Sequence, residues 1–225
     1  MTLTTPLERS ARVLIVDDHP ILRHGIAQLI TRETDFVVSG EAGSYDEALQ
    51  QLGQMEIDLM LVDLSLEGQS GLDLIRAVRE RKPQVRCLVL SMHDERLHAE
   101  RALRAGAKGY LMKQEATKKI VTALRQVRDG RIYLSDSIAS DLLERMASGT
   151  PPAVDDIHGL TDRELEVFRL IGQGLKTGEI ANALNRSVHT VEAHRASIKR
   201  KLSLKTSGEL TMAAFSLTNQ STQKV

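Results

Sequence analysis

The stretch Leu59–Gly71, LMLVDLSLEGQSG, decides the fold of this chain. Its apolar run ends on Asp63 and passes at once into a polar segment that contains glycine. This pattern predicts a buried strand that delivers one carboxylate to the edge of a sheet. An ordinary strand that ends in an acidic turn residue would look the same, so the neighbouring segments have to decide between the two interpretations.

The composition indicates a folded protein with an aliphatic core. The chain has 225 residues, enough for one large domain or two modest ones, and 41% of them are hydrophobic while 3% are aromatic. The single cysteine, Cys87 in the apolar run VRCLVL, excludes an internal disulfide and is expected to be a buried thiol. No apolar segment resembles a signal peptide or a membrane span, so we expect a cytoplasmic protein with no membrane partner.

The charge is balanced overall but unevenly distributed. Residues 1–159 contain 20 basic and 24 acidic residues, whereas residues 160–205 contain 9 basic and 5 acidic ones. The C-terminal part is therefore positive, which favours an anionic partner, with nucleic acid as the first candidate.

Apolar runs of the strand type alternate with helical patterns in the N-terminal part. The predicted strands cover residues 12–16, 36–38, 58–63, 85–91 and 109–112. Pro20 suits the first turn of a helix, Ser44 can cap the next one, and Pro83 ends the third. The alternation predicts an α/β domain with a five-stranded parallel sheet and helices on both faces.

Polar residues follow four of these strands. Asp17 and Asp18 end the first strand, Asp63 ends the third, Ser91 ends the fourth, and the fifth leads into Lys113. Sites in parallel sheets gather at the carboxyl ends of the strands, so we expect these side chains to converge. Three neighbouring carboxylates suit Mg²⁺, and a carboxylate can act as a nucleophile that accepts a phosphoryl group.

Residues 12–130 resemble a response-regulator receiver domain, which has the flavodoxin-like fold. The residues that carry the resemblance are Asp17, Asp18, Asp63, Ser91, Tyr110 and Lys113, each at the expected strand end. The resemblance implies that Ser91 bonds an oxygen of the phosphoryl group and that Lys113 neutralises its charge. Tyr110 would be an aromatic switch that turns inward when Ser91 moves.

The same resemblance assigns the acceptor and the metal site. Asp63 would accept the phosphoryl group from a sensor histidine kinase. Asp18, Asp63 and the backbone carbonyl of Ser65 would bind Mg²⁺ directly, and Asp17 would bind it through water.

Two residues depart from the receiver pattern. Glu67 stands where the family often has proline, which predicts a less rigid loop. Met92 stands where many receivers have a small residue, and its bulk would shield the acyl phosphate from water. His93 and His98 lie in or beside the charge-rich helix predicted over residues 94–105, and we expect both to be solvated surface side chains.

A boundary between two domains follows the receiver. Residues 131–147 carry an apolar helical repeat and predict a connecting helix, whereas residues 148–159 are rich in turn formers and have no periodicity. The repeat consists of Ile138, Leu142, Leu143 and Met146. The predicted organisation is a receiver over 1–130, a connecting helix and linker over 131–159, a second domain over 160–217, and a disordered tail over 218–225.

Four helix signals follow the boundary. Thr161–Glu164 matches a capping box, Thr177 can cap a short second helix, Ser187 can cap a third, and a fourth is expected after Thr206. The second and third helices form a helix-turn-helix unit in an all-α domain. The third would place its N-terminal part in the DNA major groove.

The third helix has one apolar and one basic face. Val191, Ile198 and Leu202 share the apolar stripe. The basic cluster, with no acid inside residues 195–205, consists of Arg195, Lys199, Arg200, Lys201 and Lys205.

The segment Leu160–Ala214 resembles the C-terminal DNA-binding domain of NarL/FixJ (LuxR-type) regulators. The resemblance is carried by LTDRELEVFRLIGQG, by Glu179–Ala181, and by TVEAHRASIKRKL of Thr190–Leu202. The DNA contacts that it implies are Lys176, Thr177, Ser187, Thr190, Glu192, Arg195, Lys199 and Arg200. Departures are Lys176–Gly178, Arg186 and Glu192; the last could accept from cytosine N4 or pair with Arg195 or Lys199.

Together the two resemblances imply a two-component transcription factor. Phosphorylation would promote a homodimer that binds double-stranded DNA at an operator, with RNA polymerase as a further partner. Such a protein is not a turnover enzyme.

Two alternatives remain at this point. The chain could be a regulator that keeps a receiver shape without using phosphorylation. It could also be a phosphatase or phosphotransferase with an aspartyl phosphate, like haloacid-dehalogenase enzymes, although these place a second Asp where this chain has Ser65.

Overall fold

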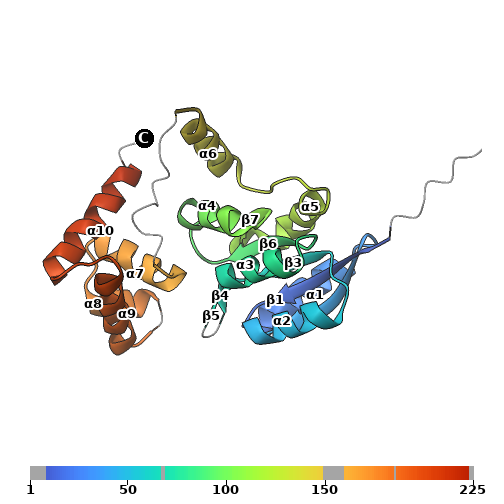
Figure 1. Cartoon of the computed structure of the whole chain (residues 1–225), viewed down its shortest axis with the longest axis horizontal. Coiled ribbons are helices and arrows are strands. Elements are labelled where there is room, and N and C mark those ends of the chain that lie inside the picture. Colours follow the sequence, from blue (N-terminus) through green and yellow to red (C-terminus); the bar gives the residue numbers. More distant parts are fainter. Residues whose placement is uncertain (1–8, 67–68, 149–159, 185, 223–225) are drawn as a thin grey trace, which may run out of the picture. The chain divides into compact units, whose positions relative to one another are not determined.

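The computed structural model describes residues 9–66, 69–148, 160–184 and 186–222. The chain divides into two compact units, Met1–Ser148 and Gly149–Val225 (Figure 1). Among the described residues, no helix is both long and apolar enough to cross a membrane.

The first unit is built on a parallel five-stranded sheet, as predicted. Its strands are β1 (Ala11–Val16), β2 (Phe36–Ala42), β3 (Leu59–Val62), β6 (Arg86–Ser91) and β7 (Gly109–Met112). Their order is β2-β1-β3-β6-β7, so the chain reverses its direction across the sheet between β1 and β3. Such a switch point lies where a crevice opens at the carboxyl ends of the strands.

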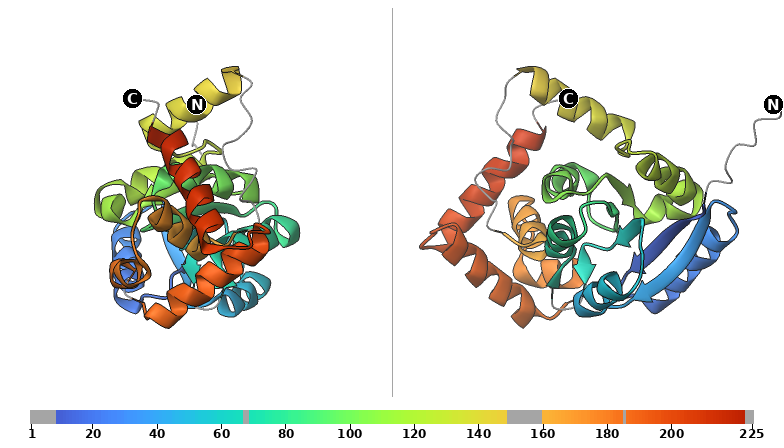
Figure 2. Two further views of the ribbon diagram at one scale, coloured as in Figure 1. Left: turned by 90° about the vertical axis from the view of Figure 1, so that its left-hand side faces the viewer. Right: turned by 45° about the vertical axis from the view of Figure 1, so that its right-hand side comes forward.

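Helices cover both faces of this sheet (Figure 2). One face carries α1 (Pro20–Thr31) and α5 (Ala116–Arg128), and the other carries α2 (Tyr45–Gln54), α3 (Gly71–Arg81) and α4 (Glu95–Ala105). The period of two in β3 separates the two cores, because Leu59 and Leu61 join one cluster while Met60 and Val62 join the other. A strand buried on both faces is therefore apolar throughout.

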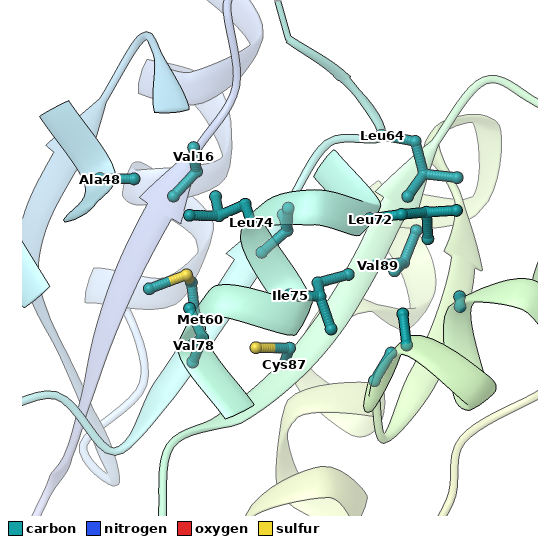
Figure 3. Packing of buried hydrophobic residues seen from close by; sticks show 14 of the residues in the cluster. Val16, Ala48, Met60, Leu64, Leu72, Leu74, Ile75, Val78, Cys87 and Val89 are labelled. Carbon is teal, nitrogen blue, oxygen red and sulfur yellow. The ribbon is translucent and has the colours of Figure 1, made fainter. Parts of the chain in front are cut away.

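Figure 3 shows the core beneath α3, where Ile75 and Val78 lie near Met60 and Cys87. Cys87 is 2% exposed, which confirms the predicted buried thiol. Burial raises its pKa to about 12, so the thiol is unreactive at neutral pH.

The segment after Asp63 contains a small hairpin that the sequence did not predict. Its strands are β4 (Ser65–Leu66) and β5 (Gln69–Ser70), and Glu67 lies outside the described residues. Gly71 then starts α3 against the backbone of β3. A Cβ on Gly71 would lie 2.1 Å from the carbonyl oxygen of Asp63, so only glycine allows this approach.

The prediction of a helix over residues 131–147 was wrong at its start, because the helix begins only at Asp136. Tyr133 forms a parallel bridge with Gly109, its carbonyl accepts from the Tyr110 N–H at 2.8 Å, and α6 (Asp136–Ser148) starts only afterwards. The exposed edge of β7 explains this, because an unpaired strand edge favours a partner. Ile138 of α6 is 5% exposed and belongs to the core of the first unit, while the Met146 side chain lies outside the described residues.

The second unit contains the four predicted helices. They are α7 (Asp162–Gly172), α8 (Thr177–Ala183), α9 (Val188–Lys201) and α10 (Ser207–Thr222). The capping box is confirmed, since Glu164 N–H donates to Thr161 Oγ1 at 3.3 Å and Thr161 N–H donates to Glu164 Oε2 at 2.6 Å. No Gly or Pro interrupts residues 218–222, and α10 continues through them where a disordered tail was predicted.

Candidate functional site

Two buried carboxylates and one ammonium group meet at the carboxyl edge of the sheet. Asp17 follows β1 and Asp63 follows β3, and each side chain is 2% exposed. Lys113 begins the short 3₁₀ helix η1 (Lys113–Glu115) directly after β7. Its Nζ lies 2.6 Å from Asp63 Oδ2 and 2.8 Å from Asp17 Oδ2. The predicted convergence of these three side chains is therefore present.

Burial and pairing set the protonation of this cluster. Burial raises the pKa of Asp63 above its ordinary value, and the neighbouring Lys113 only partly opposes this shift. Burial acts to lower the pKa of Lys113, but Asp63 and Asp17 together hold it above its ordinary value. Lys113 is therefore charged at neutral pH, and one ammonium group faces two buried carboxylates.

The donor set fits a divalent cation. Asp17, Asp18, His19 and Asp63 each offer a ligand atom, and these atoms lie within 4.8 Å of one another. Three of the four donors are carboxylates, which suits a hard cation such as Mg²⁺. His19 was not predicted here; its Nδ1 lies 2.7 Å from Asp18 Oδ1 and 3.2 Å from Asp17 Oδ1. The sequence feature that could have indicated His19 is its position directly after Asp17 and Asp18.

The loop after β3 and the end of β6 complete the rim. The Ser65 N–H donates to Asp63 Oδ1 at 3.3 Å, so this loop folds back onto the carboxylate. Ser91 is fully buried, and its Oγ accepts from the His93 N–H at 3.1 Å. Tyr110 is 1% exposed and lies inward, with its hydroxyl donating to the His93 carbonyl at 2.9 Å.

The prediction of solvated histidines was wrong. His93 is 6% exposed and His98 is 1% exposed. His98 lies on the same stripe of α4 as Ala102 and Ala105, which are also buried. The many charges of α4 concealed this stripe of small residues, whereas Met92, in the same loop as His93, is 60% exposed.

In the second unit, α9 has the predicted inner face. Val191 and Ile198 are fully buried. The Ser187 Oγ accepts from the Thr190 N–H at 3.1 Å, so Ser187 caps the helix as predicted. Arg200 is exposed and Lys199 is half-buried in the last turn.

The start of α8 differs from the prediction in one respect. Lys176, not Thr177, is the capping residue of α8, and its N–H donates to Glu179 Oε2 at 2.7 Å. The Thr177 hydroxyl instead donates to Glu192 Oε1 at 2.9 Å. Arg195 Nε lies 4.0 Å from the same oxygen, so Glu192 is held mainly by Thr177.

One member of the predicted basic cluster has an internal partner. Lys201 Nζ lies 2.6 Å from Glu164 Oε2, and the Glu164 side chain is 5% exposed. Although burial opposes it, the bonds from Lys201, Ser197 and Thr161 lower the pKa of Glu164. Lys201 therefore joins α9 to α7.

Comparisons with known proteins agree with both units. Residues 13–125 match the model of the response regulator receiver domain, and residues 158–214 match that of bacterial regulatory proteins of the luxR family. The nitrate/nitrite response regulator protein homolog of Haemophilus influenzae is 34% identical over 88% of this chain and 93% of its own length. The transcriptional activator protein ExaE of Pseudomonas putida is 37% identical over 90% of this chain and 95% of its own length.

A solved structure extends the likeness to a DNA complex. RcsB from Salmonella enterica serovar Typhimurium, bound to the rprA promoter in the presence of the phosphomimetic BeF₃⁻, has a TM-score of 0.56 and 27% identity. The match covers 90% of this chain and 97% of that one. Both matched families are regulatory, and the match to the luxR family favours a transcriptional regulator over the phosphatase alternative. The chain is a DNA-binding transcriptional regulator and belongs to the two-component response regulators that join a receiver domain to a LuxR-type helix-turn-helix domain.

Proposed function

We propose that Asp63 is the phosphoacceptor and that its phosphorylation by a sensor histidine kinase controls DNA binding. The observation that carries this proposal is the contact of 2.6 Å between buried Asp63 and Lys113, with Asp17 beside both. This arrangement supplies a carboxylate with a cation fixed beside the oxygens of an incoming phosphoryl group.

In the transfer step, a carboxylate oxygen of Asp63 bonds to phosphorus while the P–N bond of the kinase phosphohistidine breaks. The leaving imidazole takes the electron pair of that bond, and an acyl phosphate remains on Asp63. Lys113 would face the transferred oxygens, and the Ser91 hydroxyl at the end of the neighbouring strand would bond one of them. The completeness of this set argues against a regulator that keeps a receiver without using it.

We propose Mg²⁺ as the cation of this site. Asp18, Asp63 and the Ser65 carbonyl would hold it, with Asp17 acting through water. The ion would offset negative charge on the transferred group.

In the second unit, we propose that the N-terminal part of α9 reads DNA in the major groove. The predicted contacts are Lys176, Thr177, Ser187, Thr190, Glu192, Arg195, Lys199 and Arg200. The hydrogen bond between Thr177 and Glu192 makes Glu192 a positioned acceptor for cytosine N4. Phosphorylation would favour a homodimer whose two copies of α9 reach half-sites about 10 base pairs apart. RNA polymerase would be a further partner at the promoter. The protein would act in the cytoplasm.

The test replaces the acceptor and measures its modification. Purified wild type, Asp63→Asn and Asp73→Asn are incubated with acetyl phosphate and Mg²⁺ and weighed by intact mass spectrometry. Asp73 is a matched control, because it is an exposed acid in the first turn of α3. We expect one phosphoryl group on wild type and on Asp73→Asn, and none on Asp63→Asn. Labelling of Asp63→Asn to the wild-type level would refute the assignment.

A further inference from the structure

His93 occupies an unusual position in the first unit. It lies in the loop between β6 and α4, yet its side chain is only 6% exposed. Its imidazole Nε2 lies 2.6 Å from Ser65 Oγ, across the rim from β6. Ser65 belongs to the loop that folds back onto the Asp63 carboxylate, so His93 contacts the segment that carries the proposed acceptor.

The backbone of His93 makes two further bonds. Its N–H donates to Ser91 Oγ at 3.1 Å, and its carbonyl accepts from the Tyr110 hydroxyl at 2.9 Å. Three hydrogen bonds of one residue therefore join the end of β6 and Tyr110 of β7 to the loop after β3. Every atom that they involve is in a buried or half-buried residue, where hydrogen bonds hold geometry more firmly than at the surface.

The imidazole also contacts α4. The rings of His93 and His98 are stacked with their centroids 4.9 Å apart and an interplanar angle of 29°. His98 is 1% exposed on the inner stripe of α4. A displacement of the His93 ring would therefore change its contacts with both α4 and Ser65.

We infer that His93 is the positioning residue that couples the loop after Asp63 to Tyr110 and α4, an inference that rests on the proposed phosphorylation of Asp63. The side chain of His93 ties its backbone to Ser65. Because that backbone holds both Ser91 and Tyr110, a shift of the Ser65 loop moves the acceptor of the Tyr110 hydroxyl. His93 does not touch the reacting atoms, so its role is to transmit a change and not to catalyse one.

Variants of the side chain separate this role from phosphoryl chemistry. His93→Ala removes both the Ser65 bond and the stacking on His98, whereas His93→Gln keeps a polar group that can reach Ser65. Arg96→Ala is the control, because Arg96 is an exposed residue in the first turn of α4.

The experiment measures input and output of each full-length variant. Beryllofluoride with Mg²⁺ serves as the phosphoryl mimic, and its affinity gives the input. The output is the gain in affinity for a DNA duplex that is selected from a random library with beryllofluoride-loaded wild type. The chain has no Trp and three Tyr, so ¹⁹F NMR of 3-fluorotyrosine protein, assigned with Tyr110→Phe, follows the environment of Tyr110 directly.

We expect His93→Ala to bind beryllofluoride within about threefold of wild type but to lose most of an affinity gain of about tenfold, the size of an ordinary coupling between two sites. The Tyr110 signal of His93→Ala should become sensitive to solvent, and His93→Gln should restore both readouts in part. An unchanged DNA gain in His93→Ala, or a loss of beryllofluoride binding, would overturn the coupling role. A wild type without any beryllofluoride-dependent gain would instead remove the proposed function itself.

Discussion

At the carboxyl edge of the sheet, Asp17, Asp63 and Lys113 are almost fully buried, whereas Glu192 on α9 is 57% exposed and Arg200 is exposed as well. In the first region, charges lie within 2.6 to 2.8 Å of a fixed partner. In the second, exposed charges such as that of Arg200 face solvent, where salt screens them.

The difference shows how one chain uses charge for two purposes. Buried charges are costly unless each is compensated, so they are placed individually and suit a reaction at a defined atom. Exposed charges cost little and act together on a polyanion, so their number matters more than the position of any one. The two regions should therefore respond very differently to the loss of a single charge.

The largest effect is expected for Lys113→Met, which removes the ammonium group that contacts both Asp17 and Asp63. Because it leaves two buried carboxylates uncompensated, the variant should lose about 3–5 kcal/mol of its free energy of unfolding. Urea denaturation measures this loss. Added Mg²⁺ should restore more stability to this variant than to wild type, because the cation replaces the missing charge.

Lys119→Met is the matched control for Lys113→Met. Lys119 pairs with Glu115 at 2.7 Å, but both side chains are more than 40% exposed. Removing an exposed pair costs about 0–1 kcal/mol. Equal losses in the two variants would contradict the distinction between buried and exposed charge.

Smaller effects are expected for Arg200 and Lys201, two neighbouring residues of α9. One should change the salt dependence of DNA binding and the other the free energy of unfolding. Arg200→Ala should leave stability within about 0.5 kcal/mol of wild type. It should also lower the slope of log affinity against log salt for a DNA duplex by about 0.9, the value of one phosphate contact. Fluorescence anisotropy at several salt concentrations measures that slope.

Lys201→Met should behave in the opposite way. Its ammonium group is bonded to buried Glu164, so the variant should lose about 1–3 kcal/mol of stability and keep the salt slope of wild type. If Lys201→Met instead changed the slope and not the stability, Lys201 would belong with the DNA-facing charges.

The sequence predicted most of the fold and the centre of the site because both follow from local patterns. Apolar runs that alternate with helical patterns predict a parallel sheet, and the polar residues that follow its strands gather at one edge. Asp17, Asp63 and Lys113 were found in this way. The roles proposed for Ser65 and Tyr110 came from resemblance, since neither pattern nor spacing assigns a backbone carbonyl or the direction of a ring.

The missed features depend on contacts between distant segments. The buried His93 contacts Ser65 of a distant loop. Tyr133 forms a bridge with Gly109 at the edge of β7, where the strand lacks another neighbour among the described residues. In α4, numerous charges concealed the stripe on which His98 lies, because alanine contributes little to a hydrophobic pattern. The partner of Lys201 is likewise on another helix, so the sequence placed Lys201 in the basic cluster without showing that it pairs internally.

The smallest effect is expected in the change of the free energy of unfolding as the pH falls. Its sign differs between a carboxyl of the buried rim and one near the surface. The pKa of Asp35 is lowered from 3.8 to about 2, chiefly by hydrogen bonds from Arg125, with Arg128 also contributing. This stabilisation is complete above the unfolded value and is lost as the pH falls toward 2. Burial raises the pKa of Asp63, so its contribution runs the other way and favours the folded state as the pH falls.

Urea denaturation between neutral pH and about pH 3 separates the two signs. Asp35→Asn should flatten the loss of stability on acidification, by under about 1 kcal/mol because the group is partly exposed to solvent. Asp63→Asn should make that loss steeper, because it removes a term of the opposite sign. Parallel profiles for wild type and Asp35→Asn would show that the two arginines do not hold the Asp35 carboxylate, and a flatter profile for Asp63→Asn would show that burial does not dominate at the rim.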